Sequence, residues 1–292
     1  MKTVVSLQDL LELEIRPSGL LTEYQRLTEA AVRAWPAASL HRVACQACRA
    51  DQPRPAFERF GLAYQECGRC GSVYLSPRPA APVLADHAQA SEAARFWRER
   101  VLPATDAARR EKILLPRTDW VRDAIAEYAP GAGRILELAA YDLPEPRSAV
   151  QAVTAFEVID RAPDLPLLVA RIREVLEPGG LLFVTAPTIS GFELQVLWER
   201  AATIAPPEKI NVLSVDGLMA LFGEGWEVIE LSTPGMFDVE TVRRAIDADP
   251  SAPWPRAVRA LVGGDEQRRL ELQEYLQRSR LASFARLIVR RV

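Results

Sequence analysis

The chain has 292 residues, of which 49% are hydrophobic, and a formal net charge of −3 at pH 7. This length predicts one large domain with a smaller one, or two modest domains, and the apolar share is sufficient for a buried core. The near-balance of charge gives no overall attraction to nucleic acid or to an anionic membrane. The longest apolar runs fall short of the roughly 20 residues that span a bilayer. Carboxylates interrupt the apolar start, unlike in a secretory signal, so we expect a cytoplasmic protein.

The opening segment, residues 1–40, is predicted to be helical. Leucines recur in its first part, Pro17 and Gly19 interrupt it, and a second helical run follows to Trp35. Nothing in this segment suggests chemistry. We therefore interpret it as a packing surface or as the contact surface of a homodimer.

The four cysteines form two CxxC pairs, Cys45 with Cys48 and Cys67 with Cys70, and eighteen residues separate the pairs. This spacing is typical of a paired-knuckle zinc ribbon. Each turn aims two thiolates at one point, and Gly71 lets backbone amides approach the sulfurs. Four thiolates leave no position for water, so a structural zinc ion is predicted. Another metal or cluster, and a chance arrangement of cysteines, are the alternatives.

The residues around these cysteines bear on a nucleic-acid role. Asp51, Glu58 and Glu66 lie among the arginines of the module and oppose binding to phosphates. The aromatic residues fit a small core better than a base-stacking platform; they are Phe57, Phe60, Tyr64 and Tyr74. Nucleic acid is therefore the least favoured partner.

A strand, a helix and a second strand are predicted between residues 152 and 186. Residues 152–159 form a short apolar run, which suits a buried parallel strand. Apolar residues then recur at three- and four-residue steps, as on a one-faced helix. Pro178 and the two glycines after it end that helix, and residues 181–186 form the second strand. This order predicts a βαβ unit.

Two segments of the chain resemble known proteins. The words FEVID and LEPGGLLFVTAP resemble the fourth strand, following helix and fifth strand of class I S-adenosylmethionine-dependent methyltransferases. The segment FERFGLAYQECGRCGSVYLSPRP is similar to the N-terminal zinc-binding module of a subgroup that includes sugar C-methyltransferases. The resemblance implies a Rossmann-like α/β sheet flanked by helices, an S-adenosylmethionine cofactor, and a small-molecule substrate such as a nucleotide-linked sugar.

The chain departs from this family after the first predicted strand, residues 134–138. A Gly-rich turn is typical there, but this sequence continues Ala139-Ala140-Tyr141. Val153 follows Leu138 by only fifteen residues, so the family's second and third strands have no counterpart. The family's strand order is 3-2-1-4-5-7-6, which leaves a truncated sheet of strands 1-4-5-7-6. We expect the opening helices to cover the new edge strand.

The later segments also resemble the family. Residues 192–203 and 215–222 are predicted helices, and residues 226–232 and 285–292 are predicted as the sixth and seventh strands. Lys209 and Arg161 stand where histidines are typical. His41 and His87 remain, and both are expected to be surface residues outside the site.

The resemblance implies candidate site residues. Those on the cofactor side are Glu137, Ala139, Asp142, Leu143, Phe156 and Glu157. Those that face the methyl acceptor are Glu157, Asp160, Lys209 and Asn211, with Lys209 as a replacement base. A solvated lysine is the alternative for Lys209, and a carboxylate that caps a helix is the alternative for Glu137 and Glu157.

The predicted domains are helices at 1–40, a zinc-ribbon-like module at 41–80, a helical connector at 81–130 and a methyltransferase-like α/β domain at 131–292. The first functional hypothesis is a methyltransferase that acts on a small molecule without membrane association. The second is an inactive relative that serves as a binding or assembly protein. A nucleic-acid protein is the third.

Overall fold

The core of the protein is a five-stranded sheet in the computed structural model, which describes residues 12–139 and 149–292. From edge to edge its order is β6, β7, β8, β11 and β10. The strands are β6 (Ile135–Glu137), β7 (Val150–Phe156), β8 (Leu176–Pro187), β10 (Trp226–Ser232) and β11 (Phe284–Arg291). Strands β6, β7 and β8 are parallel, and β11 is antiparallel to both of its neighbours. The fold is therefore mixed α/β with a mostly parallel sheet.

The predicted βαβ unit is confirmed as β7, α7 (Leu165–Val175) and β8. The side chain of Asp164 caps α7 by accepting a hydrogen bond from the backbone N–H of Leu167, at 2.9 Å. Helix α7 ends at Val175, and Gly179 then adopts a φ of +78°, which L side chains rarely adopt. These local signals explain why the unit could be predicted from its sequence.

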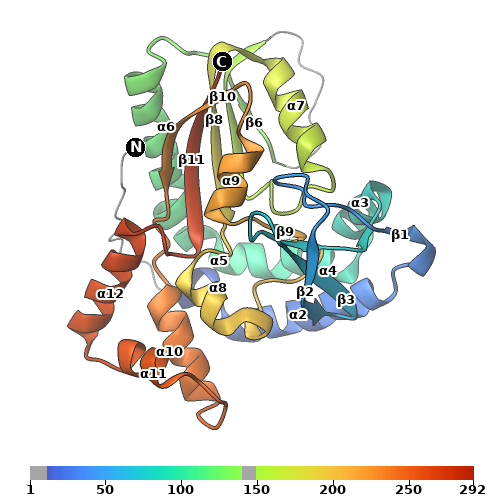
Figure 1. The fold of residues 1–292 in the computed structure, drawn as a ribbon, viewed down its shortest axis with the longest axis vertical. Coiled ribbons are helices and arrows are strands. Elements are labelled where there is room, and N and C mark those ends of the chain that lie inside the picture. The colour runs from blue at the N-terminus through green and yellow to red at the C-terminus, as the bar shows by residue number, and fades with distance from the viewer. Residues whose placement is uncertain (1–11, 140–148) are drawn as a thin grey trace.

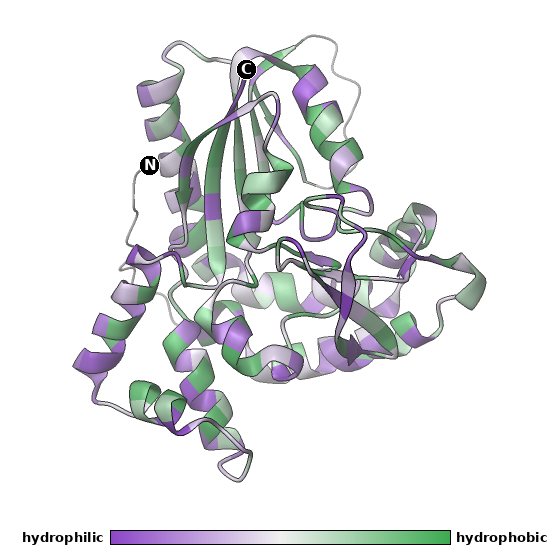
Figure 2. Ribbon diagram, in the orientation of Figure 1, coloured by the Kyte–Doolittle hydropathy of each residue, from purple (hydrophilic) through white to green (hydrophobic). Residues whose placement is uncertain are grey.

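Helices cover both faces of the sheet (Figure 1). On one face, Val121 and Ala124 of α6 (Leu115–Tyr128) pack against Ala152, Phe183 and Ile288. On the other face lie α7 and α9 (Val215–Leu221). Figure 2 shows hydrophobic colouring along the central strands, as expected for strands buried on both faces.

The long helical segment predicted before the sheet is confirmed. It comprises α3 (Ala81–Ala90), α4 (Glu92–Phe96), α5 (Leu102–Arg109) and α6, with π-helical segments η2 (Trp97–Val101) and η3 (Arg110–Leu114) between them. The opening helices are α1 (Glu12–Ile15) and α2 (Ser18–Arg33). We expected these helices to cover the edge strand β6. In the described part of the chain they do not, since Ile135 of β6 is 49% exposed.

A second sheet carries the cysteine pairs. Its strands, in order, are β2 (Pro53–Arg59), β3 (Leu62–Cys67), β4 (Val73–Leu75) and β9 (Asn211–Val212). A two-stranded ribbon pairs β1 (Leu40–His41) with β5 (Arg78–Pro79). Because β9 comes from far along the chain, this sheet joins the cysteine module to the α/β part.

The remaining helices lie around the lower end of the central sheet (Figure 1). They are α8 (Phe192–Leu197), the 3₁₀ turn η4 (Trp198–Arg200), α10 (Asp238–Ala248), α11 (Arg256–Val262) and α12 (Glu266–Arg278). The helix predicted at 192–203 is thus shorter than expected and ends in the 3₁₀ turn. Across the described residues, the helices lack the length and apolar character needed for a membrane span.

Candidate ligand-binding site and metal centre

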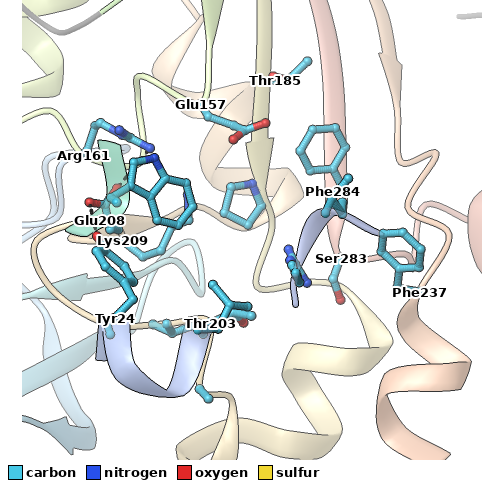
Figure 3. A pocket seen from close by; sticks show the side chains of 18 of the residues that line it. Tyr24, Glu157, Arg161, Thr185, Thr203, Glu208, Lys209, Phe237, Ser283 and Phe284 are labelled. Atoms are coloured by element: carbon cyan, nitrogen blue, oxygen red, sulfur yellow. Dashed lines mark hydrogen bonds and ion pairs between the residues drawn. The ribbon is translucent and has the colours of Figure 1, made fainter. Parts of the chain in front are cut away.

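A cavity of about 710 Å³ lies where the parallel strands end. Glu157 follows β7, Thr185 lies near the end of β8, and Phe284 begins β11; all three line the cavity. Figure 3 shows Glu157 and Thr185 at one end, with Tyr24 and Thr203 opposite them. Ligands of open α/β sheets bind outside the carboxyl ends of the strands, so this position is that of a ligand site.

The two π-helical segments contribute to the cavity wall. Trp97 and Arg98 belong to η2, Lys112 and Ile113 belong to η3, and all four side chains line the cavity. Such segments are often found at functional sites. Sequence periodicity gave no sign of them.

Cationic side chains outnumber acidic ones in the described cavity wall. The cationic residues are Arg16, Arg98, Arg109, Lys112, Arg117, Arg161, Lys209 and Arg286, and the acidic ones are Glu157, Glu193, Glu208 and Asp238. Within residues 12–139 and 149–292, Arg98, Arg109 and Arg286 form no ion pair, whereas the other five cations pair with carboxylates. The cavity therefore favours an anionic ligand.

Glu157 is one predicted site residue that does line the cavity. It has a φ of +57°, uncommon for a residue with a Cβ, and its N–H donates to the carbonyl of Thr185 at 2.8 Å. Arg117 donates to its Oε1. Burial raises the pKa of Glu157, but Arg117 and Lys209 outweigh burial and hold that pKa at about 2. Glu157 therefore stays ionised near neutral pH and is a poor proton shuttle.

Lys209 lines the cavity but is not a free base. Its ammonium forms an ion pair with Oδ2 of Asp160, a side chain with no exposed surface. Burial raises the pKa of Asp160, while Lys209 opposes that rise. Beside them, Arg161 pairs with Glu208 at 3.1 Å. The lysine is therefore not the solvated side chain that was the alternative, because it forms an ion pair with a buried carboxylate.

Asn211 is buried away from the cavity wall. Its Nδ2 donates to the carbonyl oxygens of Ile159 and Ala162, at 3.0 and 2.8 Å. Its Oδ1 accepts a hydrogen bond of 2.9 Å from Nη2 of Arg78, whose side chain has no exposed surface. These bonds tie the cysteine module to the loop after β7, so Asn211 has a structural role here.

The predicted cofactor-side residues are dispersed. Phe156 lies under the guanidinium of Arg117, with Cζ 5.3 Å from the ring centroid. Glu137 and Ala139, at the end of β6, are exposed and are not part of the cavity wall. Asp142 and Leu143 lie outside the described residues.

Two cavity residues were missed from the sequence. Glu193 on α8 is only 6% exposed, and burial, with the nearby charge of Asp238, raises its pKa to about 7. His87, expected at the surface, is instead 5% exposed, packs edge-on against Trp35 and lines the cavity. Burial lowers the pKa of His87. The sequence signal that could have identified Glu193 is a carboxylate placed between two apolar residues, Phe192 and Leu194.

The four cysteines come together as a group that can hold a metal ion, with all Sγ atoms within 4.8 Å of one another. The Sγ–Sγ distance is 3.6 Å between Cys45 and Cys70 and 3.5 Å between Cys48 and Cys67. Gly71, after the second pair, has a φ of +71°. Backbone amides also donate to the sulfurs of Cys45 and Cys67.

Comparisons with known proteins gave matches to solved structures at low identity. No protein-family model matches the sequence, and no curated protein does. An S-adenosylmethionine-dependent methyltransferase from Mesorhizobium loti is 16% identical, with a TM-score of 0.31, over 51% of this chain and 65% of that one. Coclaurine N-methyltransferase is 13% identical, with a TM-score of 0.31, over 59% of this chain and 55% of that one. The [4+2]-cyclase SpnF is 17% identical, with a TM-score of 0.29, over 58% of this chain and 61% of that one.

This chain thus spans about half to two thirds of the length of the structures that it matches. The neighbours include S-adenosylmethionine-dependent methyltransferases, and one of the three is a cyclase. Likeness at this level assigns no activity to the chain.

Proposed function

We propose that this chain is a methyltransferase-type protein whose central cavity binds an anionic small molecule, of the class of nucleotide-linked sugars. The observation that carries the proposal is the cationic excess of a cavity at the carboxyl ends of β7 and β8. The phosphates of such a ligand match the unpaired arginines, and its sugar and base match the apolar and aromatic wall, which includes Trp97 and Phe284.

The sheet supports the methyltransferase-type part of the proposal. Its order of β6, β7, β8, β11 and β10, with β11 reversed, is the order expected if the second and third strands are missing. The segment LEPGG, residues 176–180, directly follows α7 and begins β8, as the resemblance implies.

S-adenosylmethionine would supply an electrophilic methyl group, and the residues described here do not enclose it. Glu137 and Ala139 are exposed at the end of β6, and Ile135 beside them is 49% exposed. Phe156 and Glu157 are already engaged by Arg117. We therefore derive no catalytic step through the cofactor.

The second candidate function is binding or assembly without turnover, and the exposed end of β6 favours it. Glu193 favours the catalytic form, because a carboxyl with a pKa near 7 in the cavity wall can accept a proton at neutral pH. The catalytic protein and the binding protein would take the same small-molecule ligand, and only the catalytic protein would also bind S-adenosylmethionine.

We further propose that the cysteine centre holds structural zinc. Zinc–sulfur bonds of about 2.3 Å in a tetrahedron separate the sulfurs by roughly 3.8 Å, close to the two distances of 3.5 and 3.6 Å. Four thiolates fill all four positions, so such an ion has a structural role.

Calorimetric titration of S-adenosylmethionine into the zinc-replete full chain distinguishes the two forms. The binding form predicts no heat at about millimolar cofactor, and no transfer of radiolabelled methyl to nucleotide-linked sugars. Saturable binding with a micromolar dissociation constant, together with label transfer, would establish the catalytic form and exclude the other.

A further inference from the structure

Several buried polar atoms without hydrogen-bond partners belong to residues in the cavity wall or packed against it. Thr185 on β8 and Arg286 on β11 are directly opposite each other in the antiparallel register, and both line the cavity. Thr185 is 1% exposed, and its Oγ1 has no partner in the described structure. Nε of Arg286 and Nε1 of Trp120 are buried and equally without partners there. Each such atom costs free energy unless a ligand or water satisfies it.

Positive charge is concentrated at the same place. Arg286 lies over Trp120, with Cζ 4.0 Å from the ring centroid, and Arg117 lies over Phe284 at 5.8 Å. Burial lowers the pKa of Arg286 to about 10; Glu230 opposes this shift, and the charge of Arg117 adds to it. Stacking on aromatic rings fixes both guanidinium groups in orientation without neutralising them.

The local carboxylates do not balance this charge. Arg117 pairs with Glu157, and Arg286 forms no ion pair among residues 12–139 and 149–292. Arg109 is a third cation, within electrostatic range of Arg117. Its Cζ lies 6.0 Å from the ring centroid of Trp97, and it forms no ion pair with a carboxylate among the described residues. Two carboxylates, Glu157 and Glu230, thus face three arginines, which leaves an excess of positive charge in a partly desolvated wall.

We infer that Arg286, Arg117 and Thr185 form a subsite for a phosphoryl group. Planar guanidinium groups bind phosphate oxygens through paired N–H donors, and the threonine hydroxyl adds a second type of donor. This deepens the proposed function and rests on it for the identity of the whole ligand: the subsite would hold the diphosphate of a nucleotide-linked sugar.

Inorganic pyrophosphate is the probe that tests the subsite apart from the rest of the ligand. We expect the zinc-replete full chain to bind it in calorimetry, and the Arg286→Gln variant to bind about ten- to a hundredfold more weakly. Thr185→Val removes the hydroxyl with little change in shape and should weaken binding about three- to tenfold. The matched control is Arg268→Gln, since Arg268 has a side chain 76% exposed, and its affinity should equal that of the wild type.

Far-UV circular dichroism and melting curves establish that each variant is folded, and Thr185→Val serves if Arg286→Gln does not fold. The subsite is overturned if pyrophosphate binds the wild type and Thr185→Val with equal affinity. It is also overturned if pyrophosphate gives no binding heat with the wild type at about 10 mM. Binding of succinate but not pyrophosphate also overturns it. If pyrophosphate binds in an Arg286-dependent manner and nucleotide-linked sugars do not, the subsite stands and the ligand class of the proposed function fails.

Discussion

Removal of metal from the cysteine centre is expected to unfold the protein as a whole. Structural zinc contributes roughly 10–16 kcal/mol to folding in zinc-finger peptides, which matches or exceeds the typical net stability of about 5–15 kcal/mol. Cys45, Cys67 and Cys70 belong to the same buried cluster as Val153 and Leu182 of the central sheet. Loss of the metal therefore removes one wall of the main core.

The cysteine module is also tied to the sheet by polar contacts. Ser72 Oγ accepts from the N–H of Ser214 at 3.1 Å, and Ser214 Oγ donates to the carbonyl of Cys70. A Cβ on Gly217 of α9 would meet Ser72 Oγ at 2.0 Å, so this helix packs closely on the module. These contacts would transmit the loss of metal to α9.

The measurement is metal content together with circular dichroism during chelation. We expect one zinc per chain, loss of far-UV signal when a chelator removes it, and recovery when zinc is added back. Cys67→Ser should lose both metal and fold, whereas Asp51→Ser, an exposed change in the same module, should keep both. A metal-free chain that keeps its full spectrum and melting transition contradicts the structural role.

Replacement of Glu193 by Gln is expected to stabilise the protein at alkaline pH. Burial raises the pKa of Glu193 from 4.5 to about 7, so the fold favours the neutral carboxyl. The stabilising contribution of a raised carboxyl pKa is complete below pH 4.5 and is lost as pH rises through about 7. Glutamine mimics the neutral acid and escapes that loss.

Denaturant unfolding at several pH values measures this effect. The free energy of unfolding of Glu193→Gln should exceed that of the wild type by about 3 kcal/mol at pH 8 and approach it near pH 4. Glu199→Gln is the matched control, since Glu199 follows on the same segment and is exposed. It should show no such trend. A difference for Glu193→Gln that is constant across pH would mean that the carboxyl is not held neutral.

The sequence predicted those parts of the fold that depend on local signals. The βαβ unit was predicted from an apolar strand, a one-faced helix and a second apolar strand, although α7 ends at Val175 and Pro178, Gly179 and Gly180, expected to stop the helix, lie within β8. Residues 226–232 alternate along the chain and form β10. The four cysteines were paired by spacing, and their sulfurs do come together.

Contacts between distant segments could not be predicted. Nothing in residues 211–212 indicates that they complete the sheet of the cysteine module. The burial of His87 depends on Trp35 and on the cavity wall, not on its neighbours in the chain. In the sequence, Arg286 similarly resembles an ordinary strand residue. Only the pairing of β11 with β8 shows that Thr185 lies opposite it.

The candidate site was predicted only in part for the same reason. Glu157 and Lys209 line the cavity, but their roles depend on partners from other elements. Arg117 comes from α6 and Asp160 from the loop after β7. The charge of the cavity is therefore a property of the folded chain that composition alone conceals.

Titration of a nucleotide-linked sugar such as UDP-glucose into the zinc-replete full chain tests the proposed ligand most directly. We predict one binding site with a dissociation constant on the order of micromolar, and an affinity that falls as ionic strength rises because the cavity is cationic. Absence of binding heat at about millimolar ligand, or binding that ionic strength leaves unchanged, would contradict an anion-binding cavity at the end of this sheet.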